Sequence, residues 1–537
     1  MSLGTKGEGG IIVLKGILLS ILKEGPLVPV IGFLAIIGIS LFIGDGVITP
    51  AISILSAVEG IRLVPGFASI SGGSLLIIAA IIAIVLFFFQ KRGTENIAWA
   101  FGPVMFVWFL CLAVTGIISI SHAPQVLLSL NPYYAITFLL ENGFQALFVL
   151  SAVILCFTGG EALYADMGQL GRDPIVKGWY FVFPSLMLSY LGQGAYVLNH
   201  GPMGTVLFHM VASMTGPLYI PFLILSIGAT IIASQAMISG MFAVVYQAVT
   251  TRILPKMKIQ FTSSDLMSQI YIDGVNWLLL AAVLIIMVAF KTSENLAAAY
   301  GVAVAGNITI SAIMLMVIFL LKKESLKFLI SVGLIIFDAT FFIASLTKLP
   351  HGAYWSFLLA SVPFFIIIIF TRGQEKLRSS LSPIPLDQFL PQYREGYSKL
   401  NKISGAALYF ISDPKYVSPY VTQIFFENEI IYEQNIFVSI RIRDYPFGLK
   451  TQYKEECAEG LYLLIIDIGY MEIIDIESLI RERGINEKTI FYGMENIVSD
   501  RIIWKIYGVM KRLSPPFVQF YSLPSEKIHG VITRIIL

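Results

Sequence analysis

Long apolar runs separated by short polar connections make up the first two thirds of the chain. Ten of these runs are long enough to cross about 30 Å of hydrocarbon as helices. Their approximate limits are 27–60, 74–90, 100–120, 143–170, 178–198, 217–249, 274–290, 294–320, 327–347 and 353–371. The pattern therefore predicts an all-α polytopic membrane domain over residues 27–371, preceded by a cytosolic N-terminal segment, residues 1–26.

A different pattern begins after residue 371. The stretch "SPIPLDQFLP" carries three prolines without periodicity and predicts a linker over residues 372–400. The runs "GAALYFI", "NIFVSIRI" and "LYLLIIDIGY" are typical of strands, and "DRIIWKIYGVMKRL" is typical of an amphipathic helix. We expect a small α/β domain over residues 401–537. It carries no phosphate loop or dinucleotide motif, which favours a structural or regulatory role.

The composition agrees with a membrane protein. The chain is 56% hydrophobic and 13% charged, whereas soluble domains carry about 25% charged residues. The N-terminus has no signal-peptide pattern, and the three cysteines show neither metal spacing nor a disulfide framework. Nothing in the sequence indicates an enzyme, a cofactor or a nucleic-acid partner; the expected surroundings are a lipid bilayer.

Lysine and arginine in the connections predict the orientation, because cytoplasmic loops are enriched in them. One alternate set of connections holds thirteen: Lys6, Lys15, Lys23, Lys91, Arg92, Arg172, Lys177, Arg252, Lys256, Lys258, Lys322, Lys323 and Lys327. The other set holds only three: Arg62, Lys291 and Lys348. The first set is expected to face the cytoplasm of a plasma, or inner, membrane. The even number of spans returns the C-terminal domain to that side.

The first long run contains a polar stripe, within "FIGDGVITPAISILSAVEG". On a helix, Asp45, Thr49, Ser53, Ser56 and Glu59 fall within about 120° of one another and extend over about 21 Å. Pro50 has no N–H for the carbonyl of Gly46, which leaves a backbone oxygen near the stripe.

A charged side chain costs at least ~2.5–3.5 kcal/mol at the bilayer centre, so such residues usually face a cavity or a partner. Carboxylate, hydroxyl and carbonyl oxygens suit a hard alkali cation. Asp45, Thr49 and Glu59 are therefore candidates for a cation path. The alternative is that the acids lie near opposite membrane surfaces, where they are solvated or cap a helix.

A second candidate site lies in "LCFTGGEALYADMGQLG", residues 155–171. Gly159 and Gly160 can release the preceding run from helical geometry. A discontinuous span exposes carbonyls and N–H groups at mid-membrane, as at many transporter sites. Glu161, Tyr164 and Asp166 follow the two glycines directly, and Glu161 together with the free carbonyls would favour a cation. The alternative is a packing kink whose acids, Glu161 and Asp166, already lie in the cytosol.

Other polar residues in the spans are weaker candidates. Gln235 lies in "IIASQAMISG", where interhelical hydrogen bonding is an equally good explanation. Tyr300 lies in a run of small residues that favours close helix packing. Asp338, in "IIFDATFF", is a single acid in an apolar helix and is either a proton carrier or a salt-bridge partner.

At these residues the chain resembles the Kup/HAK/KT family of potassium uptake permeases. The phrases that carry the resemblance are "GDGVITPAISILSAVEG", "TGGEALYADMGQLG", "FGPVMFVWF", "ATIIASQAMISG", "ENLAAAYGVAVAG", "QIYIDGVNWLLL", "FDATFFIASLTKLPHG" and "SGAALYFISDP". They follow the family's order and cover nearly the whole chain. The resemblance implies a LeuT-type bundle with inverted five-helix repeats. It also implies potassium import coupled to protons by K+/H+ symport.

The resemblance also implies residue roles. Asp45, Thr49 and Glu59 would match the family's polar third helix. Thr158, Gly159, Gly160 and Glu161 would match its broken sixth helix, and Asp338, with Glu161, would serve proton coupling. The family's broken first helix, with its Gly-Asp-Ile-Gly-Thr-Ser-Pro-Leu-Tyr motif, and its second helix have no counterpart here. We therefore expect ten of twelve family spans.

Three functions remain open from the sequence. The first is potassium uptake by K+/H+ symport. The second is transport of another solute, such as an amino acid, on the same fold. The third is a membrane protein that does not transport, either a sensor or an inactive truncated product. The cytosolic domain could also hold two copies together as a homodimer.

Overall fold

The computed structural model describes residues 10–92, 95–160, 172–261, 270–381, 383–443, 448–469, 472, 476–482, 484–514 and 525–537. The chain forms two compact units. The membrane unit comprises Met1–Val244 and Ile259–Phe364, and the α/β unit comprises Val245–Lys258 and Phe365–Leu537. Two helices, α9 (Tyr219–Thr250) and α13 (Tyr354–Leu381), begin in the membrane unit and end in the α/β unit.

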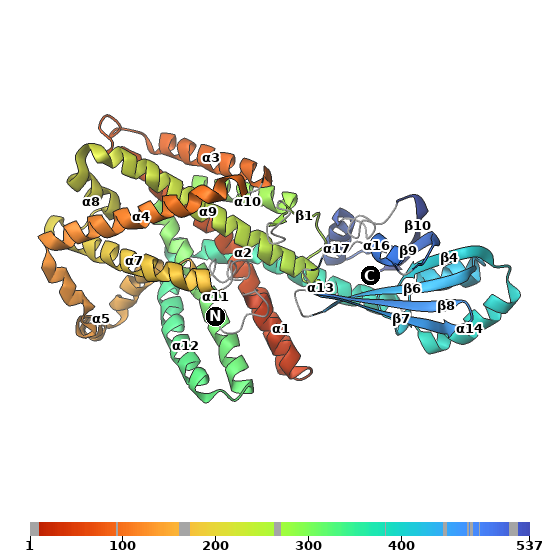
Figure 1. Ribbon diagram of the computed structural model, residues 1–537. Helices are drawn as coiled ribbons and strands as arrows, with labels where there is room; N and C mark the ends of the chain where they lie inside the picture. Colours follow the sequence, from red (N-terminus) through yellow and green to blue (C-terminus); the bar gives the residue numbers. More distant parts are fainter. Residues whose placement is uncertain are drawn as a thin grey trace. The chain divides into compact units, whose positions relative to one another are not determined.

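Helices make up the membrane unit (Figure 1). Besides α9 and α13 they are α1 (Ile11–Leu22), α2 (Leu27–Glu59), α3 (Gly72–Phe89), α4 (Glu95–His122), α5 (Pro132–Val153), α7 (Arg172–His200), α8 (Val206–Thr215), α10 (Asp273–Phe290), α11 (Ser293–Leu321) and α12 (Ser325–Leu346). Two short strands, β1 (Gln260–Phe261) and β2 (Ile270–Tyr271), pair between α9 and α10. In the described part of the chain, ten helical segments are long and apolar enough to cross a membrane, which confirms the predicted number.

Small residues let the membrane helices approach closely. At the crossing of α4 and α7, Gly116 lies directly against Gly192, and a Cβ at Gly116 would overlap the backbone oxygen of Leu188. Ser119 donates a hydrogen bond of 2.7 Å to the carbonyl of Gly192. Such contacts are typical of helices that pack in lipid, where burial of apolar area alone gives little driving force.

Two features of the membrane unit were not predicted from the sequence. Residues 11–22, within the segment expected to be cytosolic, form the apolar helix α1, whose Ile11 and Leu18 are buried. With 12 residues, α1 is too short to cross the hydrocarbon core, and its apolar run does not predict a span. In α5, Gly143 has φ +48° and breaks the helix at a position that the sequence did not single out.

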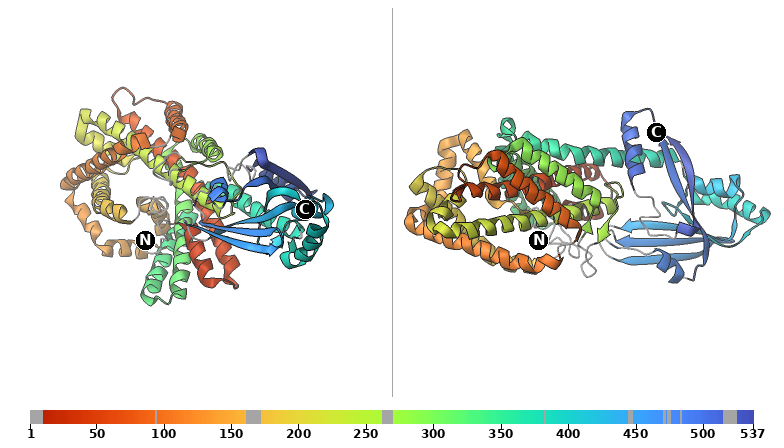
Figure 2. Two further views of the ribbon diagram at one scale, coloured as in Figure 1. Left: turned by 45° about the vertical axis from the view of Figure 1, so that its right-hand side comes forward. Right: turned by 90° about the horizontal axis from the view of Figure 1, so that it is seen from above.

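The α/β unit is built on one six-stranded sheet in the described residues. The strands are β4 (Ile403–Phe410), β6 (Tyr432–Arg443), β7 (Leu449–Ala458), β8 (Leu461–Gly469), β9 (Glu487–Val498) and β10 (Ile528–Ile536). Their order is β10-β9-β4-β6-β8-β7; all pairs are parallel except that of the edge strand β7 with β8. The strands lie side by side in every view (Figures 1 and 2). The predicted α/β architecture is confirmed.

Both faces of the sheet are covered, as a parallel sheet requires. One face carries an aromatic core that includes Phe389, Tyr409 and Phe425, under α14 (Leu386–Lys399), α15 (Pro419–Thr422) and the π-helical turn η7 (Gln423–Glu427). The other face carries an aliphatic core under α16 (Ile476–Glu482). Helix α17 (Ile502–Leu513) packs near β9 and β10.

The segment 372–400, interpreted from its prolines as a linker, is helical over most of its length. The end of α13 reaches Leu381, and a short strand β3 (Ile384–Pro385) leads into α14. Helix α14 buries Phe389, Tyr393 and Tyr397 in the aromatic core. Pro385 precedes the first residue of this helix, where its missing N–H costs nothing, and Pro391 lies inside the helix without ending it.

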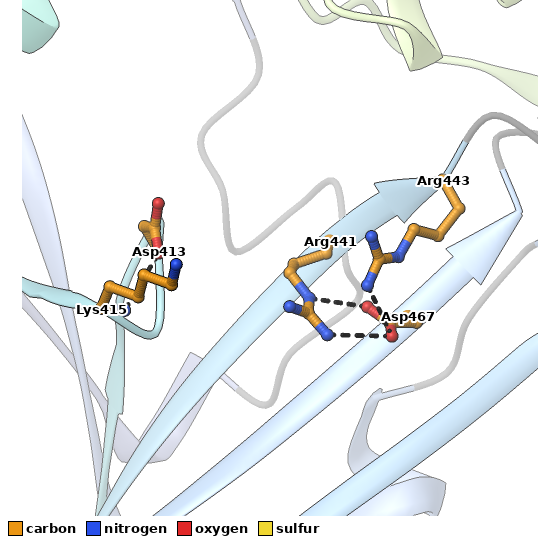
Figure 3. Close-up of polar contacts among 5 residues, drawn as sticks. All are labelled: Asp413, Lys415, Arg441, Arg443 and Asp467. Atoms are coloured by element: carbon orange, nitrogen blue, oxygen red, sulfur yellow. Dashed lines mark hydrogen bonds and ion pairs between the residues drawn. The ribbon is translucent and has the colours of Figure 1, made fainter. Parts of the chain in front are cut away.

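One buried acid of the α/β unit is paired with two arginines (Figure 3). Arg441, near the end of β6, donates to both carboxylate oxygens of Asp467, at 2.7 and 3.0 Å, and Arg443 donates to Oδ2 at 3.0 Å. Burial alone would raise the pKa of Asp467, but the hydrogen bonds from the two guanidinium groups outweigh it and hold that pKa below its ordinary value.

Candidate functional site

The centre of the candidate site is Asp45, on α2. Its side chain is buried, with 1% of the residue exposed. Thr49, one helical turn later, donates its hydroxyl to Oδ1 of Asp45 over 3.1 Å. The i, i+4 spacing brings the two side chains together on one face of the helix. Two members of the predicted polar stripe are therefore in contact inside the membrane unit.

Glycines on either side of Asp45 bring two other helices close. A Cβ at Gly44 would lie 3.2 Å from the backbone nitrogen of Ala360 in α13. A Cβ at Gly46 would overlap the terminal methyl group of Met241 in α9. Because the side chains of residues 44 and 46 point about 100° to each side of residue 45, Asp45 lies in the sector between these contacts.

The face of α2 that carries Asp45 runs antiparallel to α11. Gly38 meets Ile310, Leu41 meets Gly306, and Glu59 meets Ser293. This register places Asp45 opposite the small residues that precede Gly306. The run predicted to allow close helix packing therefore packs along the acidic stripe.

Glu59 has a clear structural partner. Its two carboxylate oxygens accept hydrogen bonds from the backbone N–H of Ser293, at 2.8 Å, and from the hydroxyl of Ser293. Ser293 is the first residue of α11, and a carboxylate there satisfies an open N–H and complements the helix dipole. The geometry favours the capping interpretation of Glu59 over a role in the ion path.

The span that ends at Gly159 is broken. Helix α5 tightens into the 3-10 turn η4 (Ile154–Phe157), Thr158 is extended, and Gly159 has φ +94°, which glycine adopts without strain. The predicted break is therefore present. Glu161 and Tyr164, the remaining candidates of this segment, lie outside the described residues, and Gly160 is the last described residue before them.

Side chains donate hydrogen bonds to backbone carbonyl groups in and before the broken segment. Tyr190 of α7 donates to the carbonyl of Cys156 at 2.9 Å, and the Thr158 hydroxyl donates to that of Leu155 at 3.2 Å. Lys348, between α12 and α13, reaches the carbonyl of Ser151 over 3.4 Å. Hydrogen bonds from other parts of the chain therefore stabilise the broken geometry.

Helix α11 connects the two candidate regions. Ile154 of η4 packs in one buried cluster with Ala305 of α11 and Phe341 of α12. A Cβ at Gly301 would lie 3.2 Å from the side chain of Ile154. The acidic face of α2 and the break after α5 therefore both pack on the small-residue stretch of α11.

The remaining candidates lie around this centre. Ser234 and Gln235 of α9 are buried, and the Ser234 hydroxyl and the Gln235 side-chain nitrogen have no hydrogen-bond partner among the described residues. Contacts of α9 with Gly60 and Gly46 of α2 show that the two helices are antiparallel and put Gln235 at a level between those glycines. Asp338 of α12 is half-buried, three residues before Phe341.

Two residues near the site were not singled out from the sequence. Asn307 directly follows the small-residue run, is buried, and has a side-chain oxygen without a partner in the described structure. Its signal was a single amide inside an apolar run. Lys348 appeared only as one of three basic residues in the sparsely charged connections; its contact with Ser151 joins parts of the chain 197 residues apart.

Comparisons with known proteins agree with this arrangement. The model of the K+ potassium transporter integral membrane domain matches residues 1–375, and that of the K+ potassium transporter C-terminal domain matches residues 404–537. A probable potassium transport system protein Kup of Methanosarcina acetivorans is 54% identical over 534 residues, 99% of this chain and 89% of that protein. Its counterpart in Geotalea uraniireducens is 53% identical over 535 residues, 100% of this chain and 88% of that protein. The resemblance in the sequence is confirmed, and the chain belongs to the Kup family of potassium transporters.

Proposed function

We propose that this chain takes up potassium across the plasma membrane together with protons, and that potassium passes along the face of α2 that carries Asp45. It is a transporter and not an enzyme, as its family membership shows. The observation that carries the path is the almost complete burial of the Asp45 carboxylate inside a bundle of apolar helices. A charged side chain is costly in an apolar interior unless it meets water, a cation or a polar partner, so a buried acid among membrane helices marks a candidate ion site.

The oxygen atoms of the site suit potassium as cargo. Asp45 supplies a carboxylate, and Thr49 uses its hydrogen for Asp45 and keeps lone pairs for a cation. The broken segment would add oxygens from Thr158, Gly159 and Gly160, and Glu161, Tyr164 and Gln235 would complete the path. Hard alkali cations prefer such ligands, and no resident cofactor is needed.

Proton coupling is assigned to Asp338 and Glu161. Asp338 lies one helical turn before Phe341, which packs against the break after α5. A carboxyl group that gains or loses a proton there could change how α12 packs on the broken segment. Such a change would link proton transfer to the potassium path.

The wider arrangement is also proposed from the family. The membrane helices would form a LeuT-type inverted repeat, the C-terminal domain would face the cytoplasm, and two copies could associate through that domain. The excess of lysine and arginine in alternate connections supports this orientation.

The decisive experiment measures rubidium uptake by cells that lack their own potassium transporters. Asp45→Asn should reduce uptake to background while the amount of protein in the membrane stays unchanged. Glu141→Gln, at an exposed acid of α5, is the matched control and should transport normally. Full uptake by Asp45→Asn would show that Asp45 is not part of the potassium path. Uptake of another solute, but not of rubidium, by the unchanged protein would overturn the proposed cargo.

A further inference from the structure

Helix α17 of the α/β unit exposes a continuous apolar face. Ile502, Ile506, Val509 and Leu513 are 73%, 44%, 52% and 80% exposed. At about 100° per residue these four side chains fall within about 60° of one another. Monomeric soluble domains rarely present so regular an apolar stripe to water.

The opposite face of α17 is firmly packed. Tyr507 is fully buried in a cluster with Phe370 and Leu377 of α13. Its ring lies 6.2 Å from that of Phe370, centroid to centroid, and directly against the backbone of Gly373. The exposed stripe is therefore held in a fixed orientation on the end of α13.

This position is next to the place where α13 leaves the membrane. The apolar run of α13 ends at Phe370 and is followed by Arg372 and Gly373. Tyr507 therefore docks within one helical turn of the end of a membrane span.

A second membrane exit lies beside α17. Helix α9 ends at Thr250, and Lys256 in the following loop is close enough to Lys511 of α17 for their charges to interact. Both contacts are internal to the α/β unit. Two independent spans thus end next to one amphipathic helix.

The charges of α17 match a lipid surface. Lys505 and Arg512, with the preceding Arg501, are exposed along one side of the apolar stripe, and no acid lies within the helix. An apolar face bordered by Lys and Arg is typical of helices in the plane of the membrane interface. Basic residues near an anionic membrane surface are attracted to its head groups. Two copies of this face would bring like charges together, which disfavours a second chain as the occupant.

We propose that α17 lies in the lipid–water interface of the leaflet where α9 and α13 end. Ile502, Ile506, Val509 and Leu513 insert among the upper acyl chains, and the basic side chains bind anionic head groups. The α/β unit is then anchored to the bilayer by a surface of its own as well as by the two helices that enter it.

The test uses the full chain in lipid nanodiscs. Cys111, Cys156 and Cys457 are first replaced by serine. Rubidium uptake by cells that express this variant confirms that it folds, before the protein is purified into nanodiscs. A nitrobenzoxadiazole dye is then attached at Val509→Cys or, as the matched control, at Ser398→Cys on the exposed side of α14. In discs of phosphatidylcholine and phosphatidylglycerol, the dye at position 509 should emit at shorter wavelength, be quenched by lipids with a shallow nitroxide, and resist reduction by dithionite. The dye at position 398 should show none of these effects.

Several outcomes would contradict the proposal. Equal dithionite reduction at both positions would show that α17 faces water. Protection at position 509 without nitroxide quenching, seen only in discs that hold two chains, would assign the face to a second copy. The combined change Lys505→Gln and Arg512→Gln should weaken nitroxide quenching in anionic discs but not in discs of pure phosphatidylcholine. If the double variant were quenched as strongly as the unchanged chain in anionic discs, these two side chains would not bind the head groups. Ile506→Glu with Leu513→Glu, at exposed positions, should release α17 from lipid while the chain stays folded.

Discussion

The two units of this protein place polar and apolar residues in opposite ways. In the membrane unit Ile77, Phe88 and many other apolar side chains are exposed, while Asp45 and Gln235 are buried. In the α/β unit the aromatic core around Phe425 is buried. The difference teaches that each unit is adapted to its own solvent, since lipid does not penalise an exposed isoleucine and water does.

The means of packing differ in the same way. The membrane unit uses glycine contacts such as Gly116 on Gly192, where backbones touch. The α/β unit uses large side chains, such as the ring of Tyr409, stacked at 5.1 Å on that of Phe491. Helix α17 is the exception, because it belongs to the α/β unit and exposes apolar residues as the membrane helices do.

The strongest test of this comparison adds one methyl group to the membrane unit. Gly116→Ala should destabilise it by about 3 kcal/mol, because the new Cβ would overlap the rigid backbone of Leu188. The measurement is the midpoint of thermal unfolding of the detergent-solubilised chain. Gly102→Ala, on the same helix with no neighbouring atom within 4 Å, should leave it unchanged. An equal effect of both changes would refute close glycine packing as the stabilising contact.

A second test compares a buried ion pair of the α/β unit with a surface pair. Asp467→Asn should cost about 2 kcal/mol, because Arg441 and Arg443 lose charge-assisted hydrogen bonds. Glu395→Gln, which removes the exposed pair with Lys399, should cost little. Chemical unfolding monitored by hydrogen exchange in β6 and β8 measures both.

The Asp467 carboxylate should also make the stability of the α/β unit depend on pH. The pKa of Asp467 is lower in the folded chain than in the unfolded chain. Its stabilisation is therefore complete above the unfolded value of about 3.9 and is lost as the pH falls below it. Asp467→Asn should remove this part of the acid sensitivity; an unchanged acid transition would contradict it.

A smaller effect separates the two acids of α2. Glu59→Gln should lower thermal stability by about 1 kcal/mol, because it weakens the cap on Ser293. Rubidium uptake should be reduced but present, in contrast to Asp45→Asn. Complete loss of uptake at unchanged stability would place Glu59 in the ion path instead.

The smallest expected effect concerns the loop after α9. Burial, with the nearby charges of Arg252 and Lys511, lowers the pKa of Lys256 to about 8. The folded chain therefore loses this proton before the unfolded chain does, and stability should rise between about pH 8 and pH 10. Lys256→Met should abolish that rise in a series of unfolding midpoints, and the exposed Lys488→Met should not.

Local patterns explain what could be predicted. The ten spans, the strands β4, β6 and β8, and helix α17 follow from apolar length or periodicity within one segment. The break at Gly159 follows from two adjacent glycines in an apolar run. Strands β9 and β10 were not predicted because polar residues interrupt their apolar runs. Strand β7 was not predicted because it is largely polar.

Long-range contacts could not be predicted in this way. Glu59 and Asp45 belong to the same polar stripe, yet only the fold shows that Glu59 caps a helix that begins 234 residues later. The contact of Lys348 with the broken segment is equally invisible in the sequence.

The sequence by itself determined that the chain crosses a membrane, which family it resembles, and which acids enter apolar helices, because burial in lipid forces a composition that can be read residue by residue. The tertiary structure alone decided that Asp45 meets a hydroxyl and Glu59 a helix end, and that one face of α17 lies open beside the end of α13. These outcomes depend on helices and strands distant in sequence, whose approach is fixed by the packing of the whole chain.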